Sequence, residues 1–263
     1  MLIDYHLHFM SHDVGAKYKP EEYVKNAKSK GLGEIGFSDH FSVEKIGVID
    51  YAMDYEELPQ YVGIIQKLKN SMKFPIKIGL EMDFIPGLES KIEKITSSYP
   101  FDYVIGSVHF IGNFAVDVPA SILEYEKSNI NEVYEKYFGL VKKASESRLF
   151  DTIGHIDLIK IFGFRPKNNI DNLLESVAET LKENGTCVEV NTGGLTKPCK
   201  EIYPSKDILK MCFENGVPVT LGSDAHKSWD IGNNFGKAIK LLKEIGYDEI
   251  ARFTRRKTEL MKF

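Results

Sequence analysis

Cysteine pairs, long apolar runs and a leader segment are missing from this sequence, and each absence excludes a class of protein. The three cysteines, Cys187, Cys199 and Cys212, are odd in number and form no CxxC pair. They indicate neither a disulfide framework nor a thiolate zinc site, so we expect reduced thiols. No apolar run approaches the roughly 18 residues of a membrane span. The start, MLIDYHLH, has neither the basic flank nor the apolar stretch of a signal peptide, so we expect a cytoplasmic protein without a membrane partner.

An excess of positive charge is absent as well. Lys and Arg total 34 against 38 Asp and Glu, and the formal charge of -4 provides no basic field for a phosphate backbone. We therefore expect no nucleic-acid partner. Of the five arginines, four fall in segments that we predict to be helical and away from strand ends: Arg148, Arg252, Arg255 and Arg256.

What is present throughout is an alternation of short apolar runs and amphipathic stretches. The 263 residues, 43% of them hydrophobic, can fill a sizeable core, and the alternation is typical of α/β architecture. We predict strands at Leu2–His6, Glu34–Ser38, Ile76–Leu80, Tyr103–Ser107, Asp151–Gly154, Cys187–Asn191 and Pro218–Gly222. We predict helices at Pro20–Gly31, Glu56–Met72, Leu88–Ser97, Asn131–Ser147, Asp171–Gly185, Ser205–Gly216 and Asn233–Gly246.

The polar residues after these strands decide between a closed barrel and an open sheet. Every predicted strand except the sixth ends in or near a potential ligand: His6, His8, Asp39, His40, Glu81, His109, His155, Asp224 or His226. An open sheet concentrates a site at one switch point, whereas a barrel brings all its strand ends to one mouth. We therefore predict an α/β fold, a distorted (β/α)7 TIM-like barrel.

The histidines indicate metal binding. His6 and His8 project to the same side of an extended strand and can hold one ion together, although an HxH pair alone is equally compatible with a structural role. Six of the seven histidines lie at predicted strand ends, and the seventh, His12, follows in the loop after HxH. Core packing would scatter them over helices and surface. Glu81 and Asp224 add negative charge, and a carboxylate can bridge two ions; taken singly, they could be a surface glutamate and a turn cap.

The ordered motifs resemble those of the PHP (polymerase and histidinol phosphatase) superfamily over nearly the whole chain, so we expect a single domain, residues 1–263. The motifs are His6-Leu7-His8, Ser38-Asp39-His40, Gly79-Leu80-Glu81, Gly106-Ser107-Val108-His109, Gly154-His155-Ile156-Asp157 and Gly222-Ser223-Asp224-Ala225-His226. The stretch Val188–Leu195, followed by Tyr203-Pro204-Ser205, resembles the histidinol-phosphatase branch.

The resemblance implies a site for about three divalent ions, Zn, Fe or Mn. The first ion would be bound by His6, His8, Glu81 and Asp224. Glu81 would bridge to a second ion on His109 and His155, and His12, His40 and His226 would bind the third. Asp39 resembles an acid/base residue beside the cluster, and Asp224 and His226 would also serve catalysis.

The branch implies hydrolysis of L-histidinol phosphate, in histidine biosynthesis, by a metal-activated hydroxide. Lys160, Arg165 and Asn191 are candidates for substrate binding, although Lys160 and Arg165 could equally be solvated loop cations. Where the branch usually has an arginine, this chain has Thr196 followed by Lys197, so we predict that Lys197 takes its place or that phosphate binding differs here.

An acidic loop from Phe41 to Glu57 suits an amine-bearing substrate, although a solvated loop leading into a helix would look the same. Its acids are Glu44, Asp50, Asp54, Glu56 and Glu57. The same superfamily includes phosphatases for nucleotides or phosphotyrosine, and exonucleases, which should show a basic track. A barrel amidohydrolase fits the SDAH and GLE contexts poorly. A metal-binding module without catalysis would usually lack some of the nine ligands.

Overall fold

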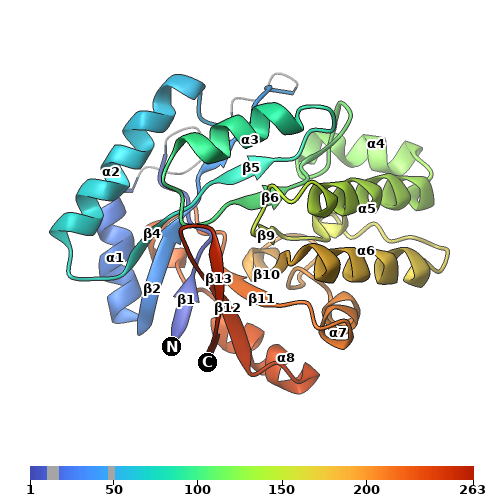
Figure 1. Cartoon of the computed structure of the whole chain (residues 1–263). Helices are drawn as coiled ribbons and strands as arrows, with labels where there is room; N and C mark the ends of the chain where they lie inside the picture. The colour runs from blue at the N-terminus through green and yellow to red at the C-terminus, as the bar shows by residue number, and fades with distance from the viewer. Residues whose placement is uncertain (11–17, 47–50) are drawn as a thin grey trace.

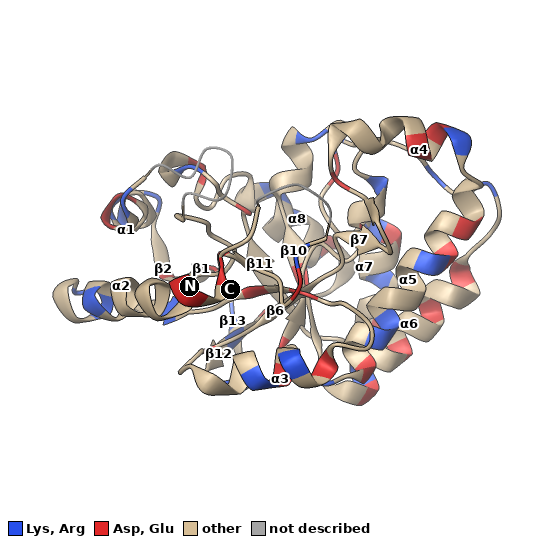
Figure 2. Ribbon diagram, turned by 90° about the horizontal axis from the view of Figure 1, so that it is seen from above, with Lys and Arg blue, Asp and Glu red and all other residues tan. Residues whose placement is uncertain are grey.

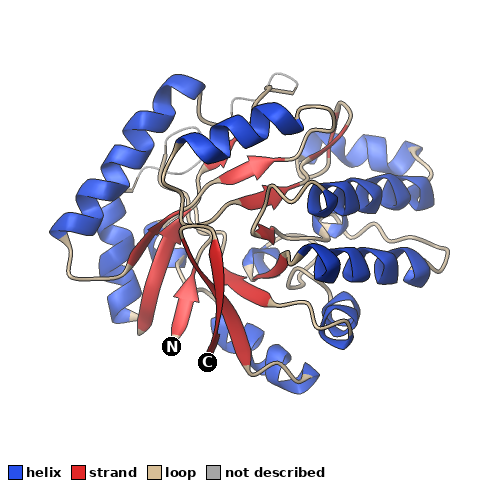
Figure 3. Ribbon diagram, viewed as in Figure 1, coloured by secondary structure: helices blue, strands red, loops and turns tan. Residues whose placement is uncertain are grey.

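Strands at the centre of the molecule are surrounded by helices, as the computed structural model shows (Figures 1 and 3). It describes residues 1–10, 18–46 and 51–263. The helices are α1 (Pro20–Ser29), α2 (Leu58–Ser71), α3 (Glu89–Ser98), α4 (Ile122–Lys127), α5 (Ile130–Glu146), α6 (Asp171–Asn184), α7 (Lys206–Glu214) and α8 (Phe235–Ile245). The strands are β1 (Leu2–Asp4), β2 (Leu32–Phe37), β3 (His40–Phe41), β4 (Ile76–Ile78), β5 (Glu81–Asp83), β6 (Ile105–Ser107), β7 (Phe110–Ile111), β8 (Phe114–Ala115), β9 (Thr152–Ile153), β10 (Cys187–Asn191), β11 (Val219–Gly222), β12 (Glu249–Thr254) and β13 (Lys257–Lys262).

Two parallel sheets close into one ring. A three-stranded sheet has the order β1-β2-β4, and a six-stranded sheet has the order β11-β10-β9-β6-β5-β3. The chain passes from the first sheet to the second between β2 and β3, and again between β4 and β5. Backbone hydrogen bonds join β1 to β11, from Tyr5 N to Leu221 O at 3.1 Å and from Ala225 N to His6 O at 3.2 Å. Seven strand positions therefore form the wall, which confirms the distorted (β/α)7 TIM-like barrel.

The connection between β4 and β5 depends on two glycines, which leave room for the aromatic ring of Tyr103. A Cβ atom at Gly36 or Gly79 would collide with the side chain of Tyr103. That side chain is buried in the barrel, where its hydroxyl donates to Tyr5 O at 2.6 Å. The interruption at Gly79 and Leu80 lets the chain change partners, so that β5 begins with Glu81 beside His40 of β3. The break thus delivers Glu81 to the mouth.

The outer helices are amphipathic, and each packs its apolar face against the core. The inner face of α5 carries buried Val133, Tyr137, Phe138 and Val141, and acidic and basic residues follow one another along the ribbons of α5 and α6 (Figure 2). Gly185 ends α6 in the left-handed conformation, with φ of 67°, which favours glycine. Among the described helices, none is both long and apolar enough to span a membrane.

A C-terminal hairpin, β12–β13, was not predicted from the sequence. Arg252 lies on β12, and Arg255 and Arg256 lie in the turn, so their placement in helices was wrong, while Arg148 follows the end of α5. Arg252 donates to both carboxylate oxygens of Glu34, with Nη2 at 2.8 Å from Oε2. The hairpin thereby covers the end of the barrel opposite the mouth.

Candidate metal centre

Eight of the nine predicted metal ligands meet at the mouth of the barrel. In four overlapping groups of three, their ligand atoms lie within 4.8 Å of one another. The eight are His6, His8, His40, Glu81, His109, His155, Asp224 and His226. His12, the ninth, lies outside the described residues. The closed ring of strands explains the convergence, because it brings loops that are distant in sequence to one place.

Glu81 occupies the middle of the cluster, and its two oxygens face different histidines. Oε2 lies 2.6 Å from His40 Nδ1 and 3.1 Å from His6 Nε2. Oε1 lies 2.9 Å from His155 Nε2 and accepts a hydrogen bond from Ser107 Oγ at 2.6 Å. A carboxylate placed in this way can bridge two cations.

Asp224 is the second carboxylate of the cluster. Its Oδ1 lies 3.3 Å from His8 Nε2, 3.7 Å from His6 Nε2 and 3.6 Å from His226 Nδ1. Asp224 and His155 have positive φ values of 56° and 23°, a region that non-glycine residues rarely occupy. Such backbone conformations cluster at functional sites, where the surrounding structure enforces them.

Two further carboxylates orient the histidines from behind. Glu189 Oε1 lies 2.6 Å from His6 Nδ1, and its Oε2 accepts the backbone N–H of His155 at 2.8 Å. Asp83 Oδ1 lies 2.6 Å from His109 Nδ1. In both cases the contact to Nδ1 turns Nε2 toward Glu81, the usual way in which a carboxylate fixes a ligating histidine.

Neither carboxylate was predicted from the sequence, and the sixth strand was expected to deliver no metal ligand. Glu189 lies within that strand, β10, whose five residues are all buried. A glutamate between Val188 and Val190 in a strand covered on both faces was a signal, because a buried carboxylate needs a polar partner. Asp83 follows Glu81 by two residues on β5, and so lies on the same face of that strand.

Charges within the cluster favour ionised carboxylates. Burial opposes this for Glu81, but the neighbouring His40 and His6 hold the pKa of its carboxyl well below the usual range. Burial lowers the pKa of His6, yet Glu189, Glu81 and Asp224 together raise it well above the ordinary value. His6 Nε2 and Glu81 Oε2 are buried, and the contacts of Glu81 Oε2 with His6 Nε2 and with His40 lack the geometry of a hydrogen bond. Nitrogen and oxygen donors arranged in this way fit Zn, Fe or Mn ions.

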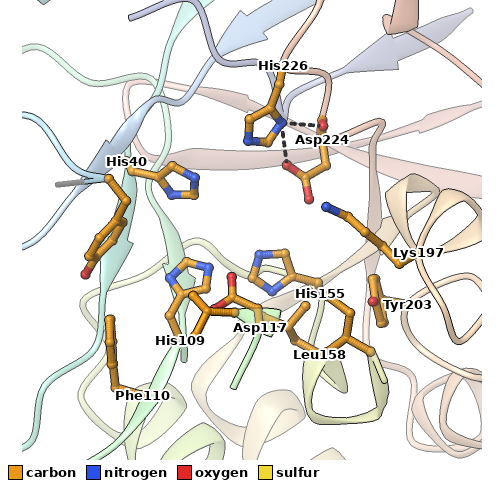
Figure 4. A pocket seen from close by; sticks show the side chains of 13 residues that line it. His40, His109, Phe110, Asp117, His155, Leu158, Lys197, Tyr203, Asp224 and His226 are labelled. Carbon is orange, nitrogen blue, oxygen red and sulfur yellow. Dashed lines mark hydrogen bonds and ion pairs between the residues drawn. The ribbon is translucent and has the colours of Figure 1, made fainter. Parts of the chain in front are cut away.

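A cavity of about 210 Å³ opens over the cluster (Figure 4). Its walls combine cluster residues with apolar and aromatic side chains and only one lysine. They are His40, Tyr51, His109, Phe110, Asp117, Val118, His155, Leu158, Ile161, Lys197, Tyr203, Asp224 and His226. The volume suits a small molecule, and the histidines lie where its reacting group would sit.

Of the predicted phosphate contacts, Lys197 lines this cavity, whereas Lys160 and Arg165 do not. Lys160 is 2% exposed and donates to Asp157 Oδ2 and Ile202 O, both at 2.8 Å. Arg165 donates to Glu201 at 2.7 Å. Both cations are engaged by protein oxygens, and a role for either in binding phosphate stays a prediction.

Asn191 and Asp39 support the site from outside the cavity walls. Asn191 is buried, and its Nδ2 donates to Glu189 at 3.1 Å and to Asp224 at 3.4 Å. Asp39 Oδ1 accepts the backbone N–H groups of Phe9 and Met10, at 2.8 and 2.6 Å. Asp39 therefore fixes the loop that follows the HxH pair. Direct contact of Asn191 with substrate and proton donation by Asp39 stay predictions.

The acidic loop also differs from the expectation. Asp54 and Glu56 line a separate cavity beside α3, and Asp54 pairs with Lys45 at 2.9 Å. Glu44 and Glu57 are absent from the walls of the cavity over the cluster, and Asp50 lies outside the described residues. The described acids of the loop are thus not placed to contact a substrate there.

Comparison with known proteins agrees with this geometry. The family model of the PHP domain matches residues 4–193, and the chain belongs to that family. Several relatives are named histidinol-phosphatase or probable histidinol-phosphatase, the branch that the motifs indicated. A probable histidinol-phosphatase of Deinococcus radiodurans is 36% identical, over 93% of this chain and 94% of its own.

Solved structures show the same relationship. The histidinol phosphate phosphatase of Lactococcus lactis, complexed with zinc, L-histidinol and phosphate, superposes with a TM-score of 0.84 at 28% identity, covering 98% of both chains. A putative histidinol phosphatase from Listeria monocytogenes, at 24% identity and a TM-score of 0.78, covers 89% of this chain and 99% of its own and shares the fold.

Proposed function

We propose that this protein is a histidinol-phosphatase, which hydrolyses L-histidinol phosphate to L-histidinol and phosphate in the cytoplasm. The observation that carries the proposal is the cluster of eight candidate ligands centred on Glu81, at the floor of a cavity sized for a small ester. The names of the relatives and the ligands of the Lactococcus lactis structure support the choice of substrate. We propose one domain over residues 1–263, with neither nucleic acid nor membrane as a partner.

The ligand geometry supports sites for three divalent ions, which we propose to be Zn, Fe or Mn. His6, His8 and Asp224 would share the first with Glu81, and Glu81 would share the second with His109 and His155. For the third, the rings of His40 and His226 each stack on His8 with centroids 4.3 Å apart. We propose His12 as a further ligand there. Divalent cations in these places would lower the pKa of a water and offset the charge of the phosphoryl group.

The protein's own residues have distinct tasks in this reaction. Lys197 is the one cation among the described cavity walls and would bind a phosphate oxygen as a point charge. The leaving alkoxide needs a proton, and His226 lines the cavity with its Nδ1 2.9 Å from Asp224 O (Figure 4), so its Nε2 would either bind the third ion or, where it is free of metal, donate that proton. Asp224 would orient that ring as well as hold metal, and the apolar walls would exclude water from the ester.

Phosphate release from four esters, after reconstitution with Mn, Zn or Fe, tests the proposal. The panel is L-histidinol phosphate, a nucleoside monophosphate, phosphotyrosine and p-nitrophenyl phosphate. We expect a kcat/KM for histidinol phosphate at least about a hundredfold above the others. Comparable slow rates on all four would exclude this substrate assignment and leave a phosphoesterase for another small ester.

A further inference from the structure

One carboxylate in the wall of the cavity belongs to no part of the metal cluster. Among the described wall residues the only acids are Asp224 and Asp117, and Asp224 faces His6 and His8. Asp117 belongs to none of the four candidate metal groups. It lies between β8 and the short helix Pro119–Ser121, and its side chain is half-buried. Its charge therefore has no assigned task in the proposed chemistry.

Among the described residues, no lysine or arginine offsets the charge of Asp117, although this charge acts on His109: burial lowers the pKa of His109, but Asp83, Glu81 and Asp117 together raise it to about 9. The one lysine among the described wall residues, Lys197, points toward Asp224 in Figure 4. Val118, Leu158 and Ile161 contribute apolar surface to the same cavity. A carboxylate in a partly apolar cavity interacts more strongly with a bound cation than it would in water.

We propose that Asp117 binds the ammonium group of the substrate and thereby selects amine-bearing phosphate monoesters. The inference rests on the proposed function. It assigns to Asp117 the contact with the substrate amine that was expected of the acidic loop from Phe41 to Glu57. A primary ammonium can make a short, charge-assisted hydrogen bond to this carboxylate while Lys197 and the cluster engage the phosphate. An ester without the amine would leave Asp117 desolvated and unpaired.

The decisive comparison uses two esters that differ only in the amine. They are L-histidinol phosphate and its deamino analogue, in which hydrogen replaces the ammonium, both with the metal-loaded protein. Asp117→Asn keeps the shape and removes the charge. We expect kcat/KM for the amine ester to fall about 10- to 100-fold, while that for the deamino ester stays within about twofold. The control is Glu124→Gln, an exposed acid on nearby α4, which should change neither.

Other outcomes would overturn the inference. An equal fall in kcat/KM for both esters would show that Asp117 acts in the chemical step or in folding. No fall for either ester would show that Asp117 does not contribute to substrate binding. If the wild type hydrolyses neither ester, the proposed function fails, and calorimetric titration with L-histidinol then decides about Asp117 alone. We expect the metal-loaded wild type to bind L-histidinol at least about tenfold more tightly than the variant. Equal binding, or none to the wild type, would contradict the inference.

Discussion

Glu81 is the residue on which the cluster depends, because its two oxygens face separate histidines. It is 1% exposed, and replacement by alanine would remove both contacts at once. We expect Glu81→Ala to lower activity by at least about a hundredfold and to reduce bound metal, since even carboxylates behind metal ligands are worth 10- to 100-fold. Metal analysis and circular dichroism measure the two effects. A folded variant with full activity and unchanged metal would contradict the assignment of the cluster.

Lys197 and Arg165 provide a matched pair of cations for testing phosphate binding. Only Lys197 lines the cavity, whereas Arg165 pairs with Glu201. We expect Lys197→Met to lower kcat/KM for phosphate esters by about tenfold, because one charged hydrogen bond to the phosphate is lost. Arg165→Met should change kcat/KM by less than about twofold. Steady-state kinetics on both variants would reverse this assignment if only the arginine variant were impaired.

At the scale of single residues, the sequence was informative about groups that bind ligands and less so about groups that support them. The histidines stand out because six occur at predicted strand ends, a pattern that reads directly from spacing. Asp117 carries no such local pattern, and the apolar neighbours of Glu189 indicate only that its carboxylate needs a polar partner, not which one. Their tasks arise from neighbours distant in the chain: His6 Nδ1 for Glu189, and the walls of the cavity for Asp117.

At the scale of elements, β10 shows how a strand without a metal ligand still shapes the centre. Its Glu189 holds the ring of His6 and the backbone of His155. We expect Glu189→Gln to weaken metal affinity by about 10- to 100-fold while the fold is retained. Titration with Mn or Zn against a competing chelator measures this. Glu183→Gln, on the exposed face of α6, is the control, and equal affinities for the two variants would show that Glu189 does not act on the metals.

The hairpin β12–β13 is the element whose loss should affect stability most without touching the mouth. Glu34 is 1% exposed, and Arg252 supplies its bidentate partner. We expect Arg252→Met to lower the free energy of unfolding by about 2 kcal/mol, because a buried carboxylate loses its main counter-ion. Urea titration checks this value. The exposed Arg148→Met should stay within about 0.5 kcal/mol, and an equal loss in both variants would exclude a specific role for the pair.

Local pattern explains why the main helices and strands could be predicted and this hairpin could not. The seven predicted helices recur within a few residues because each alternates at the helical period, and three of them end at a glycine or an asparagine: Gly185, Asn215 and Gly246. In β12–β13, by contrast, the outer strand is mostly exposed and the turn is Arg255-Arg256, in place of the usual glycine or asparagine. Tertiary contacts fix it: Asp102, Asp151 and Glu34 bind its arginines and turn, and Phe253 packs against Tyr5 and Tyr103.

At the scale of the whole molecule, the metal centre joins loops from all around the barrel, so metal binding should stabilise the entire fold. Strands β1, β3, β5, β6, β9 and β11 contribute ligands directly or through the loops that follow them. Unfolding separates those loops and destroys the site. With free metal at a thousandfold above Kd, the stabilisation is about 4 kcal/mol, or roughly 8 °C or more in Tm for a chain of this size.

Removal of metal should therefore lower Tm by about that amount, and re-addition of Mn or Zn should restore it. Scanning calorimetry before and after treatment with a chelator measures the change. Glu81→Ala serves as the internal control, because a protein that no longer binds metal should melt at the same temperature with and without chelator. A wild type that releases its metal without any change in Tm would show that the ligand loops are held by the barrel alone, and that the centre is preformed rather than assembled by its ions.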